Sequence, residues 1–126
     1  MKILIIDDDE MIANIWKLAL QQEGFTVLHS SNGKDGIDQA TRELPDIILL
    51  DQIMPDMKGN DVLQILKNDP QTKHIPIALV SNYSETNLME EAIKQGAIDY
   101  ILKYQVEPVD LVQKVKQLTQ EAQTAQ

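Results

Sequence analysis

The sequence predicts an α/β protein in which a parallel sheet of five strands carries helices on both faces. Short apolar runs rich in branched residues alternate with segments whose apolar residues recur at helical spacing. Apolar runs of this length are typical of strands buried on both faces in parallel sheets. Five repeats of strand and helix, joined by right-handed crossovers, then place helices on both faces of the sheet.

Four of the five predicted strands are almost wholly apolar, and each ends in a branched residue. They occupy residues 3–6, 47–50, 77–80 and 100–102. The fifth run, residues 26–30 (Thr-Val-Leu-His-Ser), is weaker and has polar flanks. We therefore expect this fifth strand at an edge of the sheet.

Helical periodicity fills the segments between and after the strands. The predicted helices cover residues 10–23, 33–43, 60–67, 84–95 and 108–122. Ser84 is a candidate N-cap of the fourth helix, Gly96 a candidate residue just beyond its end, and Pro108 suits the first turn of the fifth. We expect one domain over residues 1–122 and a polar tail at 123–126.

The composition excludes several classes of protein. A chain of 126 residues, 43% of them hydrophobic, suits one domain with a packed core. The chain has no Cys, which excludes disulfides and thiolate chemistry and fits a reducing compartment. Its formal net charge of −9 repels phosphates, so we expect no nucleic-acid partner. The first residues are neither a signal peptide nor a membrane anchor, so we expect a cytoplasmic protein.

Each of the four apolar strands runs into polar residues that can bind a metal ion or a phosphate. These are the pair Asp7 and Asp8, then Asp51, Ser81 and Lys103. Parallel strands align their carboxyl ends at one edge of the sheet, and ligands bind at that edge in open α/β folds. The sequence therefore predicts one site built from all five side chains.

The three acids at this edge require a compensating group. Two carboxylates about 4 Å apart repel by roughly 4 kcal/mol at an effective dielectric near 20. A raised pKa or a hard divalent cation would offset the repulsion, and Mg²⁺ suits a few carboxylates with waters and a phosphate oxygen. Acids after a strand can instead cap a helix, an equal interpretation of Asp9 and Glu10. Asp51 at the next strand end favours a metal site for Asp7 and Asp8.

Lys103 and Ser81 complete the chemistry of a phosphoryl site. Lys103 offers a compact positive charge to a phosphoryl group, and Ser81 offers a hydrogen bond to one of its oxygens. Taken alone, each also fits an ordinary ion pair or strand end. Together with the acids they indicate phosphoryl transfer to a carboxylate. The residues alone do not decide which carboxylate is the nucleophile.

Two stretches of the chain resemble response-regulator receiver domains, the CheY-like family. Residues 45–59 read Pro-Asp-Ile-Ile-Leu-Leu-Asp-Gln-Ile-Met-Pro-Asp-Met-Lys-Gly, and residues 95–103 read Gln-Gly-Ala-Ile-Asp-Tyr-Ile-Leu-Lys. The resemblance covers nearly the whole chain, residues 3–118. It implies a flavodoxin-like (βα)5 fold, doubly wound, with strand order 2-1-3-4-5.

The resemblance also implies a role for each residue of the metal site. Asp51 would be the phosphoacceptor and a ligand of Mg²⁺, for which Mn²⁺ is an expected substitute. Asp8 would bind the metal directly, together with the backbone carbonyl of Ile53. Asp7 would act through a water molecule.

Three further roles follow from the resemblance. Lys103 and Ser81 would contact the phosphoryl group, and Ser81 and Tyr100 would form the conformational switch. A half-buried strand aromatic is an equal interpretation of Tyr100. The family commonly has a proline and a cis peptide after the lysine, whereas Tyr104 follows Lys103 here. The sequence therefore does not predict the geometry of this loop.

We expect a receiver phosphorylated on Asp51 by a histidine kinase or a histidine phosphotransfer protein. It would catalyse only its own phosphorylation and dephosphorylation, slowly in the latter case because Ile53 and Tyr83 beside the site are large and not acidic. The start at Met1 and the short tail favour a stand-alone receiver. It would be a monomer or a weak phosphorylation-dependent dimer, with an unknown output protein.

The kinase or phosphotransfer protein would dock over the first helix. Met11, Ile12 and Ile15 are candidates for an apolar docking patch there, although packing on the sheet is the commoner explanation for such residues.

Four alternatives stay open at this point. The chain could be a receiver cut from a larger regulator, or a pseudo-receiver whose binding does not depend on phosphate. An aspartate-nucleophile phosphatase would need a further acid pair and usually a cap, for which there is little room. An FMN-binding flavodoxin would need a phosphate-cradling loop after the first strand, where residues 7–10 are all acidic.

Overall fold

The computed structural model describes residues 1–124 of the chain. Five parallel strands form one sheet in the order β2-β1-β3-β4-β5, which confirms the predicted fold. The strands are β1 (Lys2–Ile6), β2 (Thr26–Ser30), β3 (Ile47–Asp51), β4 (Ile77–Ser81) and β5 (Asp99–Leu102). The weakest predicted strand, β2, lies at an edge as expected.

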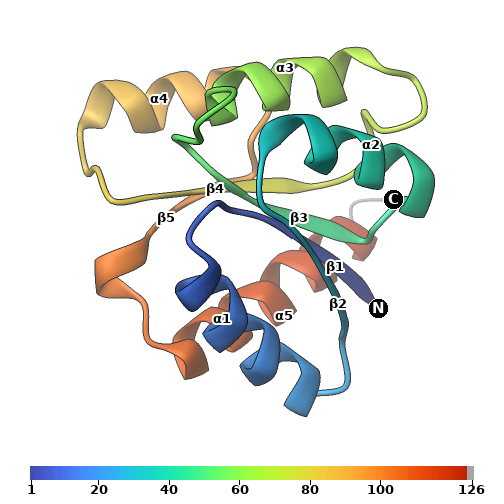
Figure 1. Cartoon of the computed structure of the whole chain (residues 1–126), viewed down its shortest axis with the longest axis vertical. Helices are drawn as coiled ribbons and strands as arrows, with labels where there is room; N and C mark the ends of the chain where they lie inside the picture. The colour runs from blue at the N-terminus through green and yellow to red at the C-terminus, as the bar shows by residue number, and fades with distance from the viewer. Residues whose placement is uncertain (125–126) are drawn as a thin grey trace.

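Five α-helices cover the two faces of the sheet. They are α1 (Glu10–Gln22), α2 (Gly33–Glu43), α3 (Gly59–Asn68), α4 (Thr86–Lys94) and α5 (Pro108–Thr124). Helices α1 and α5 pack on one face, and α2, α3 and α4 on the other (Figure 1). Helix α5 continues two residues past its predicted end, and residues 125–126 of the predicted polar tail lie outside the described part of the chain.

The strands divide their side chains between two hydrophobic layers. Ile3 and Ile5 of β1 face α1 and α5, while Leu4 and Ile6 face α2 and α3, and none is more than 1% exposed. Burying one such side chain stabilises the fold by roughly 1.5–3 kcal/mol. Because a shift of one residue would exchange the two layers, the register of each strand is fixed. The carboxyl ends of β1, β3, β4 and β5 are thereby aligned.

Helix α4 begins later than the sequence predicts. The predicted N-cap, Ser84, is wrong, because Glu85 is the N-cap and remains extended at φ −66° and ψ 128°. The Ser81 hydroxyl accepts a hydrogen bond from the backbone N–H of Tyr83, which holds the chain in a turn before the helix. At the other end, Gly96 takes the left-handed conformation at φ 106°, as predicted.

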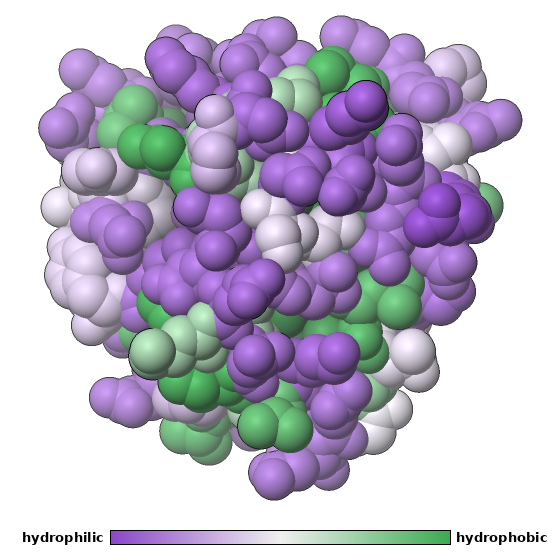
Figure 2. Space-filling model, viewed as in Figure 1, coloured by the Kyte–Doolittle hydropathy of each residue, from purple (hydrophilic) through white to green (hydrophobic). Residues whose placement is uncertain are grey.

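The surface is mainly hydrophilic, with local apolar patches. Figure 2 shows such patches in the lower part of the view, where α1 lies. The exposed apolar side chains of α1 are Met11, Ile15 and Leu18, whereas Trp16 is buried in the core. No helix of residues 1–124 combines the length and the hydropathy needed to cross a membrane.

Candidate phosphoryl and metal site

Two buried acids and one buried lysine meet at the carboxyl edge of the sheet. Asp7 follows β1, Asp51 is the last residue of β3, and Lys103 follows β5. The Lys103 Nζ lies 2.8 Å from Asp7 Oδ2 and 3.1 Å from Asp51 Oδ1. The three side chains are at most 8% exposed, so these ion pairs are shielded from solvent.

A third acid, Asp8, completes an arrangement that can hold a metal ion. One carboxylate oxygen from each of Asp7, Asp8 and Asp51 lies within 4.8 Å of the others. Asp8 is exposed, so the cluster opens to solvent on its side. Three carboxylates face a single ammonium group, and this excess of negative charge fits a hard divalent cation with oxygen ligands.

The electrostatics of the cluster change the titration of two of its members. Burial, and then the charge of Asp7, raise the pKa of Asp51 from 3.8 to about 7, although Lys103 partly opposes them. Burial lowers the pKa of Lys103, but its hydrogen bonds and charge interactions with Asp7 and Asp51 outweigh burial and raise it above its ordinary value. Lys103 therefore stays positive while Asp51 sits in surroundings that disfavour its negative charge.

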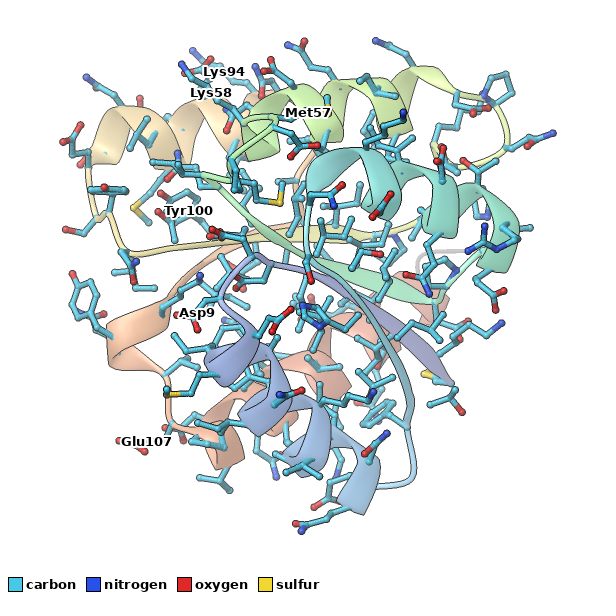
Figure 3. All side chains as sticks on the ribbon, in the orientation of Figure 1. Asp9, Met57, Lys58, Lys94, Tyr100 and Glu107 are labelled. Atoms are coloured by element: carbon cyan, nitrogen blue, oxygen red, sulfur yellow. The ribbon has the colours of Figure 1, made fainter. Side chains whose placement is uncertain are left out.

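Asp7 is held in place from both sides. Its backbone N–H donates to the carbonyl of Ser30 at 3.0 Å, and its Oδ1 accepts from the N–H of Asp9 at 2.9 Å. The Asp9 carboxylate in turn accepts from the N–H of Ile12 and so caps α1, at whose start it lies (Figure 3). The capping interpretation of Asp9 and Glu10 is therefore confirmed, and the two residues add to the negative charge beside the site.

The loop after Lys103 does not contain the cis peptide bond that is common in the family. No peptide bond is cis among the described residues. Lys103 instead begins a short 3-10 turn, η1 (Lys103–Gln105), and Tyr104 points outward with 60% of its surface exposed. This turn lets Lys103 reach the acids without a following proline.

The hydroxyl of Ser81 lies at the end of β4 but is engaged by a residue that the sequence did not suggest. Ser81 is 1% exposed, and its Oγ donates to Gln52 Oε1 at 2.5 Å. The Tyr100 hydroxyl donates to the same Gln52 oxygen at 2.9 Å and lies 2.9 Å from the carbonyl oxygen of Tyr83. Gln52 therefore links the two residues that were predicted to form the switch.

Tyr100 packs inside the protein on the face covered by α3 and α4 (Figure 3). It is only 8% exposed, and burial raises the pKa of its phenol above the ordinary value.

The alternation of side chains between the two faces of the sheet could have indicated that Gln52 lies on the same face as Tyr100. Leu50 faces the layer of α3 and α4, so Gln52, two residues later, faces that layer too.

The loop between β3 and α3 is pinned against Asp51 by Gly59. The Gly59 N–H donates to the Gln52 carbonyl at 2.6 Å. A Cβ at position 59 would overlap the carbonyl oxygen of Asp51, so only glycine allows this approach. The Gly that closes the first family-like stretch thus positions the backbone of the candidate phosphoacceptor.

Asp56 anchors the same loop to a different helix. Its two carboxylate oxygens accept from the N–H groups of Gly33 and Lys34 at 2.9 and 3.0 Å. These backbone hydrogen bonds lower the pKa of Asp56. This cap leaves no local pattern in the sequence, because the aspartate lies more than twenty residues from the helix it caps.

A small open cavity of about 270 Å³ lies above the cluster. Its lining residues all come from the carboxyl ends of strands and the following loops: Asp8, Asp9, Asp51, Gln52, Ile53, Ser81, Asn82 and Tyr83. The side chains of Ile53 and Tyr83 are each about half exposed at its rim. Four of the predicted site residues, Asp8, Asp51, Ile53 and Ser81, thus line one cavity, whereas Asp7, Lys103 and Tyr100 are not among its lining residues.

Comparison with known proteins agrees with this geometry. The model of the response regulator receiver domain matches residues 3–116. The chain is 36% identical to the response regulator PleD of Caulobacter vibrioides over 94% of this chain and 26% of PleD. It is 35% identical to the protein PilH of Pseudomonas aeruginosa over 86% of this chain and 87% of PilH. The chain thus spans about a quarter of PleD but most of PilH.

A solved structure of similar shape supports the same assignment. The CheY-like receiver domain protein from Methanospirillum hungatei superposes with a TM-score of 0.91 at 28% identity, covering 99% of this chain and 98% of that one. The segment that the family model matches contains the whole sheet except Lys2, the first residue of β1, and all the acids of the site. The chain therefore belongs to the response regulator receiver domains of two-component signalling.

Proposed function

We propose that this receiver is switched by phosphorylation of Asp51 in a Mg²⁺-dependent reaction. The observation that carries the proposal is the contact of the Lys103 ammonium with both Asp7 and Asp51, beside an open cavity that Ser81 also lines. A purely structural ion pair needs no cavity and no third acid. A phosphoryl site needs both.

The phosphoryl group would come from a phosphohistidine of a histidine kinase or a phosphotransfer protein. An oxygen of the Asp51 carboxylate forms a bond to phosphorus as the phosphorus–nitrogen bond breaks, and the leaving imidazole takes a proton from solvent. Only the ionised carboxylate is nucleophilic. The burial that raises the pKa of Asp51 to about 7 therefore has to be offset before transfer.

Asp7, Asp8 and Asp51 are the residues that would hold the metal, with the backbone carbonyl of Ile53 as a further proposed ligand. When bound, Mg²⁺ would neutralise the carboxylates and the charge that develops on the phosphoryl oxygens. The excess of carboxylates over ammonium groups supports this assignment. We extend it to Mn²⁺, which accepts the same oxygen ligands.

Lys103 and Ser81 would stabilise the transferred group. Lys103 already contacts Asp51 Oδ1 and can hold an oxygen of a phosphoryl group on the same carboxylate. Ser81 has one hydroxyl proton, which can rotate towards the cavity that the residue lines. We propose in addition that the protein catalyses only its own phosphorylation and dephosphorylation.

Dephosphorylation would be slow because the two side chains that flank the site, Ile53 and Tyr83, are large and cannot orient an attacking water well. Ile53 and Tyr83 occupy the rim and carry no acid or amide group. A phosphoryl half-life of seconds would contradict this part of the proposal.

The histidine-bearing partner would dock on the exposed apolar side chains of α1. Met11 and Ile15 are 74% and 46% exposed, and α1 begins beside the cavity at Asp9. Of the predicted patch, only Ile12 is partly buried against the core. An output protein would bind at the β5 edge of the sheet, near Tyr104. A cytoplasmic location suits a chain without Cys.

PilH supports a stand-alone receiver, since it is matched over 87% of its length. PleD is matched over 26% of its length and represents the alternative, a receiver within a longer regulator. The molecular mass of the native protein on an immunoblot separates the two.

Labelling with a phosphodonor tests the proposal. Acetyl phosphate with Mg²⁺ should add one phosphoryl group to the wild type, detected by intact mass, and none to Asp51→Asn. Asp61→Asn is the matched control, because Asp61 is an exposed acid of α3 outside the cluster. Label retained on Asp51→Asn would disprove the assignment of the acceptor. An unlabelled wild type beside a labelled control receiver would favour the pseudo-receiver.

A further inference from the structure

Gln52 is a buried polar residue for which the proposed chemistry has no use. It is 6% exposed, directly follows Asp51, and its side-chain oxygen accepts hydrogen bonds from both Ser81 and Tyr100. Burial of an amide is unfavourable unless its polar atoms are paired. A glutamine at this position therefore needs its two hydroxyl partners.

The hydrogen bonds around Gln52 share only two hydroxyl protons. The Ser81 proton goes to Gln52 Oε1, and the Tyr100 proton lies between Gln52 Oε1 and the carbonyl oxygen of Tyr83, each 2.9 Å away. A carbonyl oxygen has two lone pairs, so Gln52 Oε1 can accept both hydroxyls. The 2.5 Å separation from Ser81 suits O–H···O and is too short for an amide N–H donor, which places the carbonyl end of Gln52 towards Ser81.

The backbone of Gln52 cannot follow a movement of Ser81. Its N–H donates to the Val80 carbonyl at 3.0 Å, and its carbonyl accepts from Gly59 at 2.6 Å. Strands β3 and β4 are held in place by the two hydrophobic layers of the core. With its backbone held, Gln52 meets a change in the bonding of Ser81 through its side-chain oxygen and the remaining hydroxyl donor, Tyr100.

We propose that Gln52 is a positioning residue that couples the hydroxyl of Ser81 to Tyr100 and to the loop of residues 82–85. The inference rests on the proposed function, in which Ser81 turns its one proton to a phosphoryl oxygen on Asp51. Gln52 Oε1 then loses that donor and takes the Tyr100 proton alone. Tyr100 gives up its hydrogen bond to the carbonyl of Tyr83.

Tyr83 would lose one of the two attachments of its backbone in this step. Its carbonyl is held by Tyr100 and is released, whereas its N–H still donates to Ser81 Oγ at 3.0 Å. The loop leads directly into α4, whose N-cap, Glu85, makes no side-chain capping hydrogen bond. Phosphorylation thereby loosens the loop where it enters the first turn of α4.

The released loop borders a second surface. Gln52 and Tyr83 also line an open groove of about 480 Å³ next to α3 and α4. Gln52 thus separates the cavity where the phosphoryl group would bind from a groove that a partner can reach. A change in the loop alters that groove without any movement of the sheet.

Nuclear magnetic resonance of the full chain tests the coupling, with beryllofluoride and Mg²⁺ as the probe. In the wild type, the backbone amides of Asp51, Lys103, Tyr83 and Ser84 should all shift. Gln52→Met keeps the length of the side chain and removes the acceptor. It should keep the shifts at Asp51 and Lys103 and reduce those at Tyr83 and Ser84 at least threefold. Gln64→Met, an exposed change on α3, should behave as the wild type.

A second measurement needs no ligand. Ser81→Ala and Tyr100→Phe should be non-additive in the unfolding equilibrium constant by at least threefold, because both lose the same acceptor. In the Gln52→Met background this non-additivity should become smaller, because only the backbone of Tyr83 and the direct contact of the two hydroxyls still connect the side chains.

The outcomes separate the inference from the proposed function. Wild-type shifts at Tyr83 and Ser84 in Gln52→Met, or additivity of Ser81→Ala and Tyr100→Phe with Gln52 present, would overturn the role of Gln52. If beryllofluoride shifts no resonance of the wild type, the proposed function fails and the signalling role of Gln52 fails with it. The ligand-free cycle would still report whether Gln52 links the two hydroxyls.

Discussion

The two halves of the site are held by different forces. On the side of β1 and β3, Asp7 and Asp51 are tied to Lys103 by buried ion pairs of 2.8 and 3.1 Å. On the side of β4 and β5, Ser81 and Tyr100 are tied to Gln52 by hydrogen bonds between neutral groups. We call these the charged half and the neutral half.

The two halves differ in the free energy that a change of state requires. Breaking a buried ion pair leaves an uncompensated charge, which is strongly unfavourable. Moving a hydroxyl proton from one acceptor to another exchanges bonds that are each worth about 1 kcal/mol net. The charged half is therefore suited to hold the reaction in place, and the neutral half to report it.

Replacement of Lys103 in the charged half should lower the free energy of unfolding more than any other change proposed here. Lys103→Met leaves Asp7 and Asp51 buried without a counter-charge, and we expect the free energy of unfolding at pH 8 without metal to fall by about 3–5 kcal/mol. Urea denaturation measures this change. The control is Lys116→Met, which breaks an exposed pair with Glu23 and should cost less than about 1 kcal/mol. Equal losses for the two variants would contradict the distinction between buried and exposed pairs.

Replacement of Asp51 should stabilise the protein in a pH-dependent manner. The pKa of Asp51 is about 7 in the folded chain against an ordinary 3.8, so the folded chain keeps a proton that the unfolded chain loses between these values. The contribution of Asp51 to stability is present below about pH 4 and is lost as the pH rises through 7.

Without metal, the free energy of unfolding of Asp51→Asn should therefore rise relative to that of the wild type by about 2 kcal/mol from pH 5 to pH 8. Thermal or urea unfolding at the two pH values measures this difference. A constant difference would mean that burial does not raise the pKa of Asp51.

Added Mg²⁺ should stabilise the charged half. At a concentration ten times its dissociation constant, a ligand of the folded state adds about 1.4 kcal/mol. Asp8→Asn should remove most of this gain while changing the metal-free stability by less than about 0.5 kcal/mol, since Asp8 is exposed. Asp61→Asn serves as the control. An undiminished response of Asp8→Asn to Mg²⁺ would exclude Asp8 as a ligand.

The neutral half should give the smallest effect. Tyr100→Phe removes one shared hydroxyl and should lower the free energy of unfolding by about 1 kcal/mol, with the same value with and without Mg²⁺. Tyr104→Phe, at a hydroxyl on a side chain that is 60% exposed, should change nothing measurable. A loss at Tyr100 that depends strongly on Mg²⁺ would show that the two halves are already coupled before phosphorylation.

Residues at strand ends were the most predictable part of the site. Asp7, Asp51, Ser81 and Lys103 each stand where an apolar run stops, and parallel strands bring such positions to one edge. Gly59 could be recognised from the family-like stretch, but its reason, the backbone of Asp51 against it, is visible only in three dimensions.

Contacts between distant segments were not predictable. The Asp56 carboxylate caps α2 from another loop, and Gln52 accepts a hydrogen bond from Tyr100, 48 residues away. Neither pairing leaves a local pattern, because the partners meet only after the sheet has formed. The extended conformation at Glu85, which displaced the expected cap at Ser84, depends in the same way on the fold.

The order of strands and helices along the chain, the two buried layers and the edge where the acids gather could all be predicted from the sequence. Those features follow from the periodicity of apolar residues, which is a property of neighbouring positions. The way Lys103 reaches two acids without a following proline, and the acceptors of the Ser81 and Tyr100 hydroxyls, depend on the folded arrangement. Such details depend on distances of a few tenths of an ångström between segments far apart in the chain, and packing of the whole core sets those distances.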